Sequence, residues 1–281
     1  MSSAATLPVS IEFFPPNTPV GSEKLKTVVQ DLSVLKPEFF SVTYGAGGAT
    51  RDKTLATVRD IAAMGHEAAP HLSCVGSTRE NIAEILATYR AQGIHRIVAL
   101  RGDLPSGTAV AGEFRYASDL VRFIRETQGS DWHIEVAAYP EYHPEQRYAR
   151  RDLQHFVDKV KCGATSSITQ FFFNPDAYFH FVDEVRAMGV EVPIVPGIMP
   201  IHSFSRIVQF AASDGIEIPR WVMLKMEGYL DDAASVRAFG IDVVTRLCER
   251  LIAGGVPSIH FYALNQSALT LEICKRLGLA G

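Results

Sequence analysis

Short apolar runs rich in β-branched residues alternate with longer amphipathic segments along the whole of this chain, giving eight strand–helix units. Parallel strands need crossover connections, which helices usually supply, so the alternation predicts a parallel sheet. Eight units within 281 residues favour closure of that sheet, because (β/α)8 barrels commonly span about 250 residues. We therefore expect a single α/β domain, residues 1–281, of the (β/α)8 or TIM barrel class.

The expected elements follow one another without a linker or a low-complexity tract. The strands are Val9–Phe13, Phe39–Thr43, Glu67–Leu72, Arg96–Arg101, Ile134–Tyr139, Ser167–Phe171, Glu191–Pro196 and Ser258–Tyr262. The helices are Ser22–Leu35, Arg51–Met64, Thr78–Gln92, Tyr116–Thr127, Arg147–Cys162, Pro175–Met188, Ser203–Ala212, Ala233–Ala253 and Gln266–Leu277. We expect the segment around Glu217–Ala253 to be an extra helical insertion before the last strand. Asn174 followed by Pro175 predicts a helix start, because asparagine caps helices and proline suits their first turn.

Composition and charge limit the classes of function. The net charge is −4 and the sequence pI is near 6.1, whereas a nucleic-acid binder usually carries a basic face, so we expect no nucleic-acid partner. Since no apolar run approaches the roughly 20 residues that cross a bilayer, we expect no membrane partner. The four cysteines are scattered and form no CxxC pair, which favours reduced thiols, a cytoplasmic location and the absence of a metal site.

The barrel prediction also locates the functional site, because barrel active sites lie at the C-terminal ends of the strands. Glu12 stands near the end of the first expected strand, within Ile11-Glu12-Phe13-Phe14-Pro15-Pro16. Such apolar neighbours should desolvate the carboxylate, raise its pKa and suit it to donating a proton near neutral pH. The alternative is a carboxylate paired with a neighbouring cation such as Arg101.

Two loops beside this strand have residues suited to ligand binding. After the fourth strand, Gly102 would let the backbone approach a ligand, Arg101 could bind a phosphate and Asp103 could accept hydrogen bonds from a heterocycle. An Arg–Asp pair that stabilises the turn is the alternative. The glycine-rich segment 45–50 lacks the third glycine of the dinucleotide-binding fingerprint. It is better explained as a loop at the barrel mouth, with Thr43 at its entrance.

The segment after the fifth strand combines small residues, aromatic rings and titratable groups. Ala137 and Ala138 leave room for a flat ligand, and Tyr139 precedes His143, which could equally be an ordinary loop histidine. On one face of the next helix, Asp152 and Lys159 could contact a ribose and a phosphate, or form a solvated ion-pair face.

Gln170 lies near the end of the sixth expected strand, Ser167–Phe171. Its amide both donates and accepts, so it could bind a pterin or a nicotinamide. A structural hydrogen bond is the alternative, since buried polar groups need partners.

Nine motifs, in register along the chain, resemble methylenetetrahydrofolate reductases. They are Glu12-Phe13-Phe14-Pro15-Pro16, Ser41-Val42-Thr43-Tyr44-Gly45-Ala46, Ala69-Pro70-His71-Leu72, Leu100-Arg101-Gly102-Asp103-Leu104-Pro105, Tyr116-Ala117-Ser118-Asp119-Leu120, Ala137-Ala138-Tyr139-Pro140-Glu141, Ile168-Thr169-Gln170-Phe171-Phe172-Phe173, Pro196-Gly197-Ile198-Met199-Pro200 and His260-Phe261-Tyr262-Ala263-Leu264-Asn265. The similarity runs from about Val9 to Leu277, and the length resembles that of the short bacterial form.

This resemblance implies a noncovalent FAD across the C-terminal mouth of the barrel. The residues implied to bind it are Thr43, His71, Arg101, Gly102, Asp103, Tyr116, Ala117, Ala137, Tyr139, His143, Asp152 and Lys159. The residues implied to bind substrate are Glu12, Asp103, Gln170, Phe210 and Tyr262. Glu12 and Asp103 are the implied catalytic residues.

The resemblance also implies the reaction, which is reduction of 5,10-methylenetetrahydrofolate to 5-methyltetrahydrofolate by NADH or NADPH in two half-reactions through FAD. Glu12 would be the proton donor, Asp103 would hydrogen-bond the pterin and Phe210 would stack on either substrate. The product would supply methyl groups for methionine synthesis, and a homo-oligomer is implied. Arg206 departs from the family pattern, which has a folate-binding glutamine at that place.

Two other functions fit parts of the same pattern. One is a reductase of this fold that transfers hydride without a flavin, and the other is a non-redox folate-binding barrel. Arg101, Asp152 and Lys159 argue against both, because neither function requires an FAD site.

Overall fold

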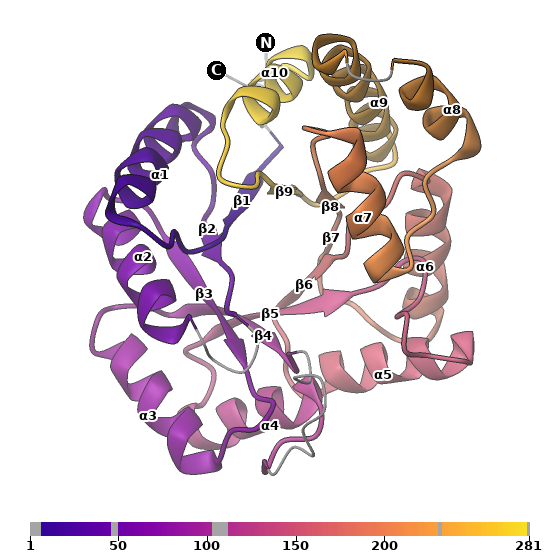
Figure 1. The fold of residues 1–281 in the computed structure, drawn as a ribbon. Helices are drawn as coiled ribbons and strands as arrows, with labels where there is room; N and C mark the ends of the chain where they lie inside the picture. Colours follow the sequence, from indigo (N-terminus) through magenta and orange to yellow (C-terminus); the bar gives the residue numbers. More distant parts are fainter. Residues whose placement is uncertain (1–6, 46–49, 103–111, 230–231, 280–281) are drawn as a thin grey trace, which may run out of the picture.

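The structure is a computed structural model that describes residues 7–45, 50–102, 112–229 and 232–279. Its strands form one parallel sheet with helices arranged around it (Figure 1). The strands are β1 (Val9–Phe13), β2 (Phe40–Val42), β3 (Ala68–Ser73), β4 (Arg96–Leu100), β5 (His133–Ala138), β6 (Ser166–Thr169), β7 (Ile194–Val195), β8 (Gly197–Ile198) and β9 (Ile259–Tyr262). The helices are α1 (Pro19–Leu32), α2 (Arg51–Ala63), α3 (Arg79–Arg90), α4 (Ala117–Gln128), α5 (Ala149–Lys161), α6 (Pro175–Ala187), α7 (Phe204–Asp214), α8 (Arg220–Tyr229), α9 (Ala233–Ala253) and α10 (Ala268–Arg276).

The order of the strands confirms the barrel. The sheet runs β7-β6-β5-β4-β3-β2-β1-β9-β8, and its two end strands, β7 and β8, are separated in the sequence only by Pro196. β7 pairs with β6 while β8 pairs with β9, so one short chain segment joins both edges of the sheet. This segment is the seventh barrel strand, and it begins and ends later than the predicted Glu191–Pro196. Pro196 has no N–H to donate, but its carbonyl accepts a hydrogen bond from the His260 N–H at 3.0 Å.

The extra helices and several helix boundaries also agree with expectation. α7, α8 and α9 all lie between β8 and β9, which confirms a helical insertion before the last strand. Asn174 caps α6 by accepting a hydrogen bond from the Asp176 N–H, and Pro175 is the first helical residue. Helix α1 begins earlier than predicted, because the Thr18 hydroxyl caps it through the Gly21 N–H. None of the described helices is long and apolar enough to span a membrane.

Strand alternation divides the core into two apolar clusters. Val9, Ile11 and Phe13 point from β1 toward the helices, where they join the larger cluster. A second cluster fills the inside of the barrel and consists of Phe39, Ala69, Val98, Ile168 and Val195.

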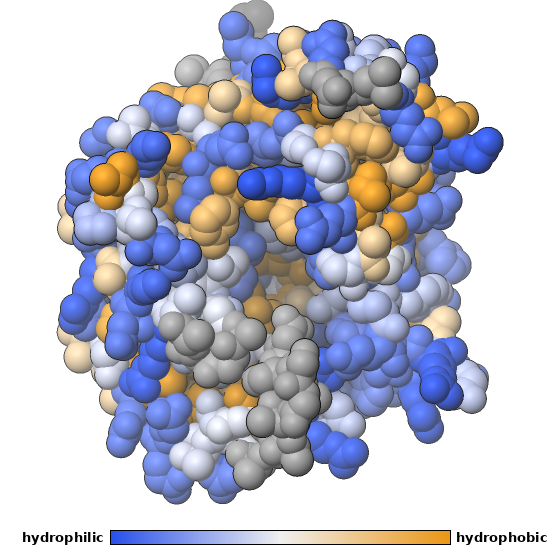
Figure 2. Space-filling view, viewed as in Figure 1, coloured by the Kyte–Doolittle hydropathy of each residue, from blue (hydrophilic) through white to orange (hydrophobic). Residues whose placement is uncertain are grey.

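At the N-terminal end of the strands, the barrel interior is filled by a charged network. Arg96 contacts the carboxylates of Glu67 at 2.8 Å and Glu135 at 2.9 Å, and its guanidinium lies over the Phe39 ring. Glu135, although buried, is also held by His133 and by the Ser166 hydroxyl. The network supplies the buried Glu135 carboxylate with hydrogen-bond and ion-pair partners, which a buried charge needs. The barrel is therefore filled at this end, and the opposite, C-terminal end remains for binding ligands. The space-filling view shows the face of Figure 1 hollowed near its centre (Figure 2).

Candidate active site

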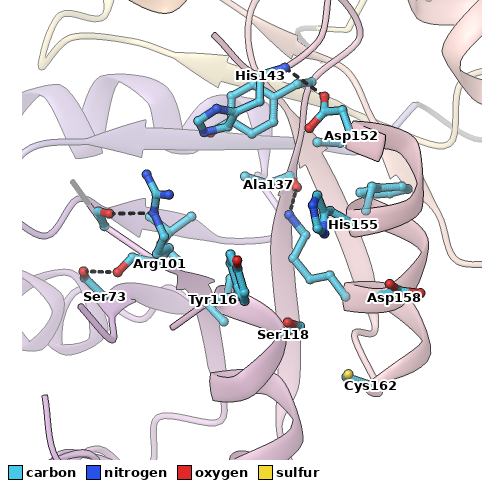
Figure 3. A pocket seen from close by; sticks show the side chains of 18 of the residues that line it. Ser73, Arg101, Tyr116, Ser118, Ala137, His143, Asp152, His155, Asp158 and Cys162 are labelled. Atoms are coloured by element: carbon cyan, nitrogen blue, oxygen red, sulfur yellow. Dashed lines mark hydrogen bonds between the residues drawn. The ribbon is translucent and has the colours of Figure 1, made fainter. Parts of the chain in front are cut away.

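A cavity of about 1190 Å³ opens at the C-terminal ends of β4, β5 and β6 and continues between α4 and α5. Ten of the residues predicted to bind cofactor or substrate line it: Arg101, Gly102, Tyr116, Ala117, Ala137, Tyr139, His143, Asp152, Lys159 and Gln170. Arg101 stands on one side of the cavity, and Asp152, His155, Asp158 and Cys162 follow one another along α5 on the other (Figure 3). Asp103, predicted to be catalytic, lies outside the described residues.

On the β4 side, Arg101 binds Glu145 through two hydrogen bonds of 2.8 and 3.0 Å. Glu145 is more than half exposed, so this pair lies near the surface and can open to an anionic ligand at modest cost. The backbone of Arg101 is fixed separately, because its carbonyl accepts a hydrogen bond from the Ser73 hydroxyl at 2.9 Å. Gly102 has φ +84°, and a Cβ there would lie 1.8 Å from the Ser73 Oγ. Only glycine fits this turn.

On the β5 side, Lys159 donates a hydrogen bond to the Ala137 carbonyl at the end of β5. Burial lowers the pKa of Lys159 to about 8, although Asp152 partly opposes the shift. Asp152 in turn accepts a hydrogen bond from the His143 N–H at 2.8 Å. Both residues therefore hold the β5–α5 loop in place, and neither is simply part of a solvated helix face.

His143 is held in a defined orientation. Its Nδ1 accepts a hydrogen bond from the Glu145 N–H at 3.2 Å, and its ring packs edge-on against Tyr139, with centroids 4.6 Å apart. Burial lowers the pKa of His143, which favours the neutral ring. With Nδ1 as acceptor, the proton of the neutral ring is on Nε2, which leaves a hydrogen-bond donor for a ligand.

Three residues at the outer end of the cavity, His155, Asp158 and Cys162, were not predicted from the sequence. There the Tyr116 ring stacks on His155, with ring centroids 5.8 Å apart and an angle of 23° between the ring planes. Asp158 and Cys162 line the same end. The signal was present in the sequence, because His155 stands three residues after Asp152 and four before Lys159, on the helix face already singled out.

Glu12 lies inside the barrel beside two histidines, and its predicted raised pKa is wrong. His71 Nε2 is 3.1 Å and His260 Nε2 3.5 Å from the same Glu12 oxygen, Oε2. Burial alone would raise the pKa of Glu12, but the attraction of His71 and His260 outweighs it and lowers the pKa to about 2. The predicted alternative of a paired carboxylate is thus nearer the structure, with histidines as the partners in place of the suggested Arg101.

His260 was not singled out as a site residue, yet it is fully buried beside Glu12. Its Nδ1 is 2.7 Å from the Ser10 hydroxyl, which can donate to it and leave the ring proton on Nε2, the atom that lies 3.5 Å from Glu12 Oε2. His71, predicted to bind cofactor, belongs to the same cluster. Two-residue strand periodicity could have found both missed members, because Ser10 shares a face with Glu12 and His260 with Tyr262.

Of the other predicted residues, Thr43, Phe210 and Tyr262 do not line the cavity, whereas Gln170 does. Gln170 donates a hydrogen bond from Nε2 to Asp214 at 3.1 Å, and Tyr262 donates its hydroxyl proton to the Thr169 carbonyl at 2.7 Å. Thr43 directly follows β2, and its N–H donates a hydrogen bond to the Phe13 carbonyl. Phe210 is half-buried on α7 and packs against the main core cluster.

The fold and the site together define a class of protein. It is a (β/α)8 barrel with an elongated, cation-bearing cavity at the C-terminal ends of its strands and a carboxylate–histidine cluster beside it. Barrel enzymes have their active sites at this end.

Comparisons with known proteins assign the family. Residues 2–278 match the family model described as methylenetetrahydrofolate reductase. A 5,10-methylenetetrahydrofolate reductase of Salmonella typhimurium is 42% identical over 96% of this chain and 90% of its own length, and that of Escherichia coli is 41% identical over the same shares. The chain belongs to the methylenetetrahydrofolate reductase family and is therefore an oxidoreductase.

One more distant relative and one protein of similar fold extend the comparison. A longer protein of Oryza sativa, named probable methylenetetrahydrofolate reductase (NADH), is 36% identical over 96% of this chain and 48% of its own length. A Clostridium thermocellum protein, solved with two copies of 5-methyl-5,6,7,8-tetrahydrofolic acid, has a similar fold, with a TM-score of 0.67 and 17% identity over 98% of this chain and 94% of its own.

Proposed function

We propose that this protein reduces 5,10-methylenetetrahydrofolate to 5-methyltetrahydrofolate with electrons from NADH or NADPH, using FAD, and so supplies methyl groups for methionine synthesis. The observation that carries the proposal is that a single cavity joins the charged residues to the barrel interior. One elongated cavity has Arg101 and Lys159 at its charged part and Gln170 where it meets the barrel interior. The family membership indicates the same reaction. The four free thiols, three of them buried, fit the proposed cytoplasmic location.

The residues of the cavity fit FAD in size and in charge. Its volume of about 1190 Å³ exceeds the roughly 300–1,000 Å³ of an ordinary small-molecule pocket, as a dinucleotide requires. Arg101 and Lys159 would hold the diphosphate, and the Tyr116–His155 pair would contact the adenine. Ala137 and Ala138 leave space for the flat ring system. When bound, FAD would supply a hydride carrier between nicotinamide and folate.

Glu12 would provide the proton that opens the five-membered ring of the folate. At neutral pH, a carboxylate with a pKa of about 2 has no proton of its own to donate. His71, whose Nε2 lies 3.1 Å from Glu12 Oε2, is placed to pass one to it. A folate bound over Glu12 would exclude water, raise its pKa and favour the protonated form. The proton would then pass to the folate nitrogen as the ring opens to an iminium ion.

Lys159 predicts how FAD affinity depends on pH. A diphosphate beside Lys159 would raise its pKa above the value of about 8 in the empty site, so binding takes up a proton above that pH. We expect the affinity to be nearly constant below about pH 8 and to fall by up to about tenfold per pH unit above it. Fluorescence titration of the apoprotein with FAD between about pH 6.5 and 9.5 measures this.

The matched control is Lys159→Arg, which keeps the positive charge but does not titrate in this range. Its FAD affinity should vary little with pH. If Lys159→Arg lost affinity above pH 8 as steeply as the unmodified protein, Lys159 would not be the titrating group.

A further inference from the structure

Asp214 is the last residue of α7, and its side chain reaches the same cavity as Gln170. Neither the sequence motifs nor the proposed cofactor site includes it. A carboxylate at a helix C-terminus faces the negative end of the helix dipole, where a negative charge is unfavourable. A contribution to helix stability therefore does not account for Asp214, and its contacts in the cavity point to another role.

Asp214 fixes which way the Gln170 amide points. An ionised carboxylate only accepts hydrogen bonds, so the group that faces Asp214 Oδ2 at 3.1 Å must be the Gln170 NH2. On its other side, Gln170 Oε1 accepts a hydrogen bond from the Phe171 N–H at 3.0 Å. The amide is thus held at both ends, with one N–H and one oxygen lone pair still available.

The group that these remaining sites would recognise is defined by its chemistry. The pyrimidine edge of a folate has a 2-amino group and a ring N–H as donors beside a carbonyl acceptor. The Gln170 amide can pair with one donor and one acceptor of that edge, and the Asp214 carboxylate adds a charged acceptor for a second donor. The carboxamide of a nicotinamide also has a donor and an acceptor for Gln170, but it has no ring N–H donor for the Asp214 carboxylate.

We propose that Asp214 is a positioning and specificity residue, which orients Gln170 so that the two side chains together select the 2-amino-4-oxo edge of the folate. This inference rests on the proposed function, because it concerns the folate half of the site. Asp214 would act on folate binding and have little effect on nicotinamide oxidation.

The test compares Asp214→Ala and Asp214→Asn in the FAD-loaded protein. Calorimetry with 5-methyltetrahydrofolate measures binding without turnover, and NADH oxidation with an artificial acceptor measures the other half-reaction. We expect Asp214→Ala to weaken folate binding about tenfold, as loss of a charged hydrogen bond does, with NADH kinetics unchanged. Asp214→Asn, whose carbonyl can still accept from Gln170, should restore most of the affinity.

A double variant separates positioning from a merely local effect. If Asp214 acts through Gln170, Asp214→Ala should cost much less in a Gln170→Ala background than alone. Glu217→Gln is the charge-matched control, because it removes an exposed carboxylate that does not line the cavity and should leave folate binding unchanged.

The outcomes distinguish the two proposals. Unchanged folate affinity in Asp214→Ala, equal losses for folate and NADH, or additive effects with Gln170→Ala would overturn the role of Asp214 alone. Failure of the unmodified protein to bind 5-methyltetrahydrofolate would instead contradict the proposed function. Melting temperatures of all variants identify any that fail to fold, and Asp214→Asn, which preserves shape, keeps the comparison valid.

Discussion

Replacing Glu12 with glutamine is expected to abolish reduction of methylenetetrahydrofolate while leaving oxidation of NADH by the flavin almost intact. Proton transfer by a positioned side chain typically contributes about 10²–10⁴ in rate, so the folate half-reaction should slow by that factor. Glutamine retains the shape of the side chain but cannot carry the proton between His71 and the substrate. Hydride transfer from nicotinamide requires no proton from this residue.

Stopped-flow absorbance of the flavin resolves the two half-reactions of Glu12→Gln. Glu23→Gln, which changes a largely exposed residue of α1, is the control and should affect neither. Equal slowing of both half-reactions would show that Glu12 maintains the site as a whole and does not act as the acid on the folate side.

Replacing Gly197 with alanine is expected to produce the largest loss of stability. A Cβ at this position would lie 2.1 Å from the Thr169 carbonyl oxygen and 2.6 Å from the Tyr262 ring. The first contact is with backbone, which cannot move aside without disturbing the junction of β6, β8 and β9 that closes the barrel. Overpacking of this kind typically costs about 1–3 kcal/mol, and we expect the upper end of that range.

Chemical denaturation measures the change in the free energy of unfolding. Gly228→Ala is the matched control, because no atom lies within 4 Å of its added Cβ and it stands inside α8. Alanine favours helices over glycine by up to about 1 kcal/mol, so this variant should be neutral or more stable. Equal stability of the two variants would contradict the tight junction at Gly197.

The barrel could be predicted from the sequence because its signals are local. Alternation of strands and helices, the Asn174-Pro175 cap and the spacing of Asp152 and Lys159 all depend on residues close together in the chain. The break at Pro196 was harder to predict, because the strand on its far side is only Gly197–Ile198 and is stabilised by pairing with β9.

The pKa of Glu12 was predicted wrongly because it depends on residues that are far away in the sequence. Its immediate neighbours are apolar and favour a raised pKa, but the groups that determine its charge come from β3 and β9. His260 is 248 positions away in the sequence, and only closure of the barrel brings it to Glu12. A pKa that depends on contacts across a barrel cannot be derived from one strand.

The anaerobic visible spectrum of the purified protein tests the central claim most directly. It is measured with FAD supplied, then after addition of NADH, and then after addition of methylenetetrahydrofolate. We predict a flavin band that bleaches with NADH and returns with the folate, since both proposed half-reactions would use the same cavity. Absence of bound flavin would contradict this account and favour hydride transfer without a flavin, or a folate-binding barrel without redox chemistry.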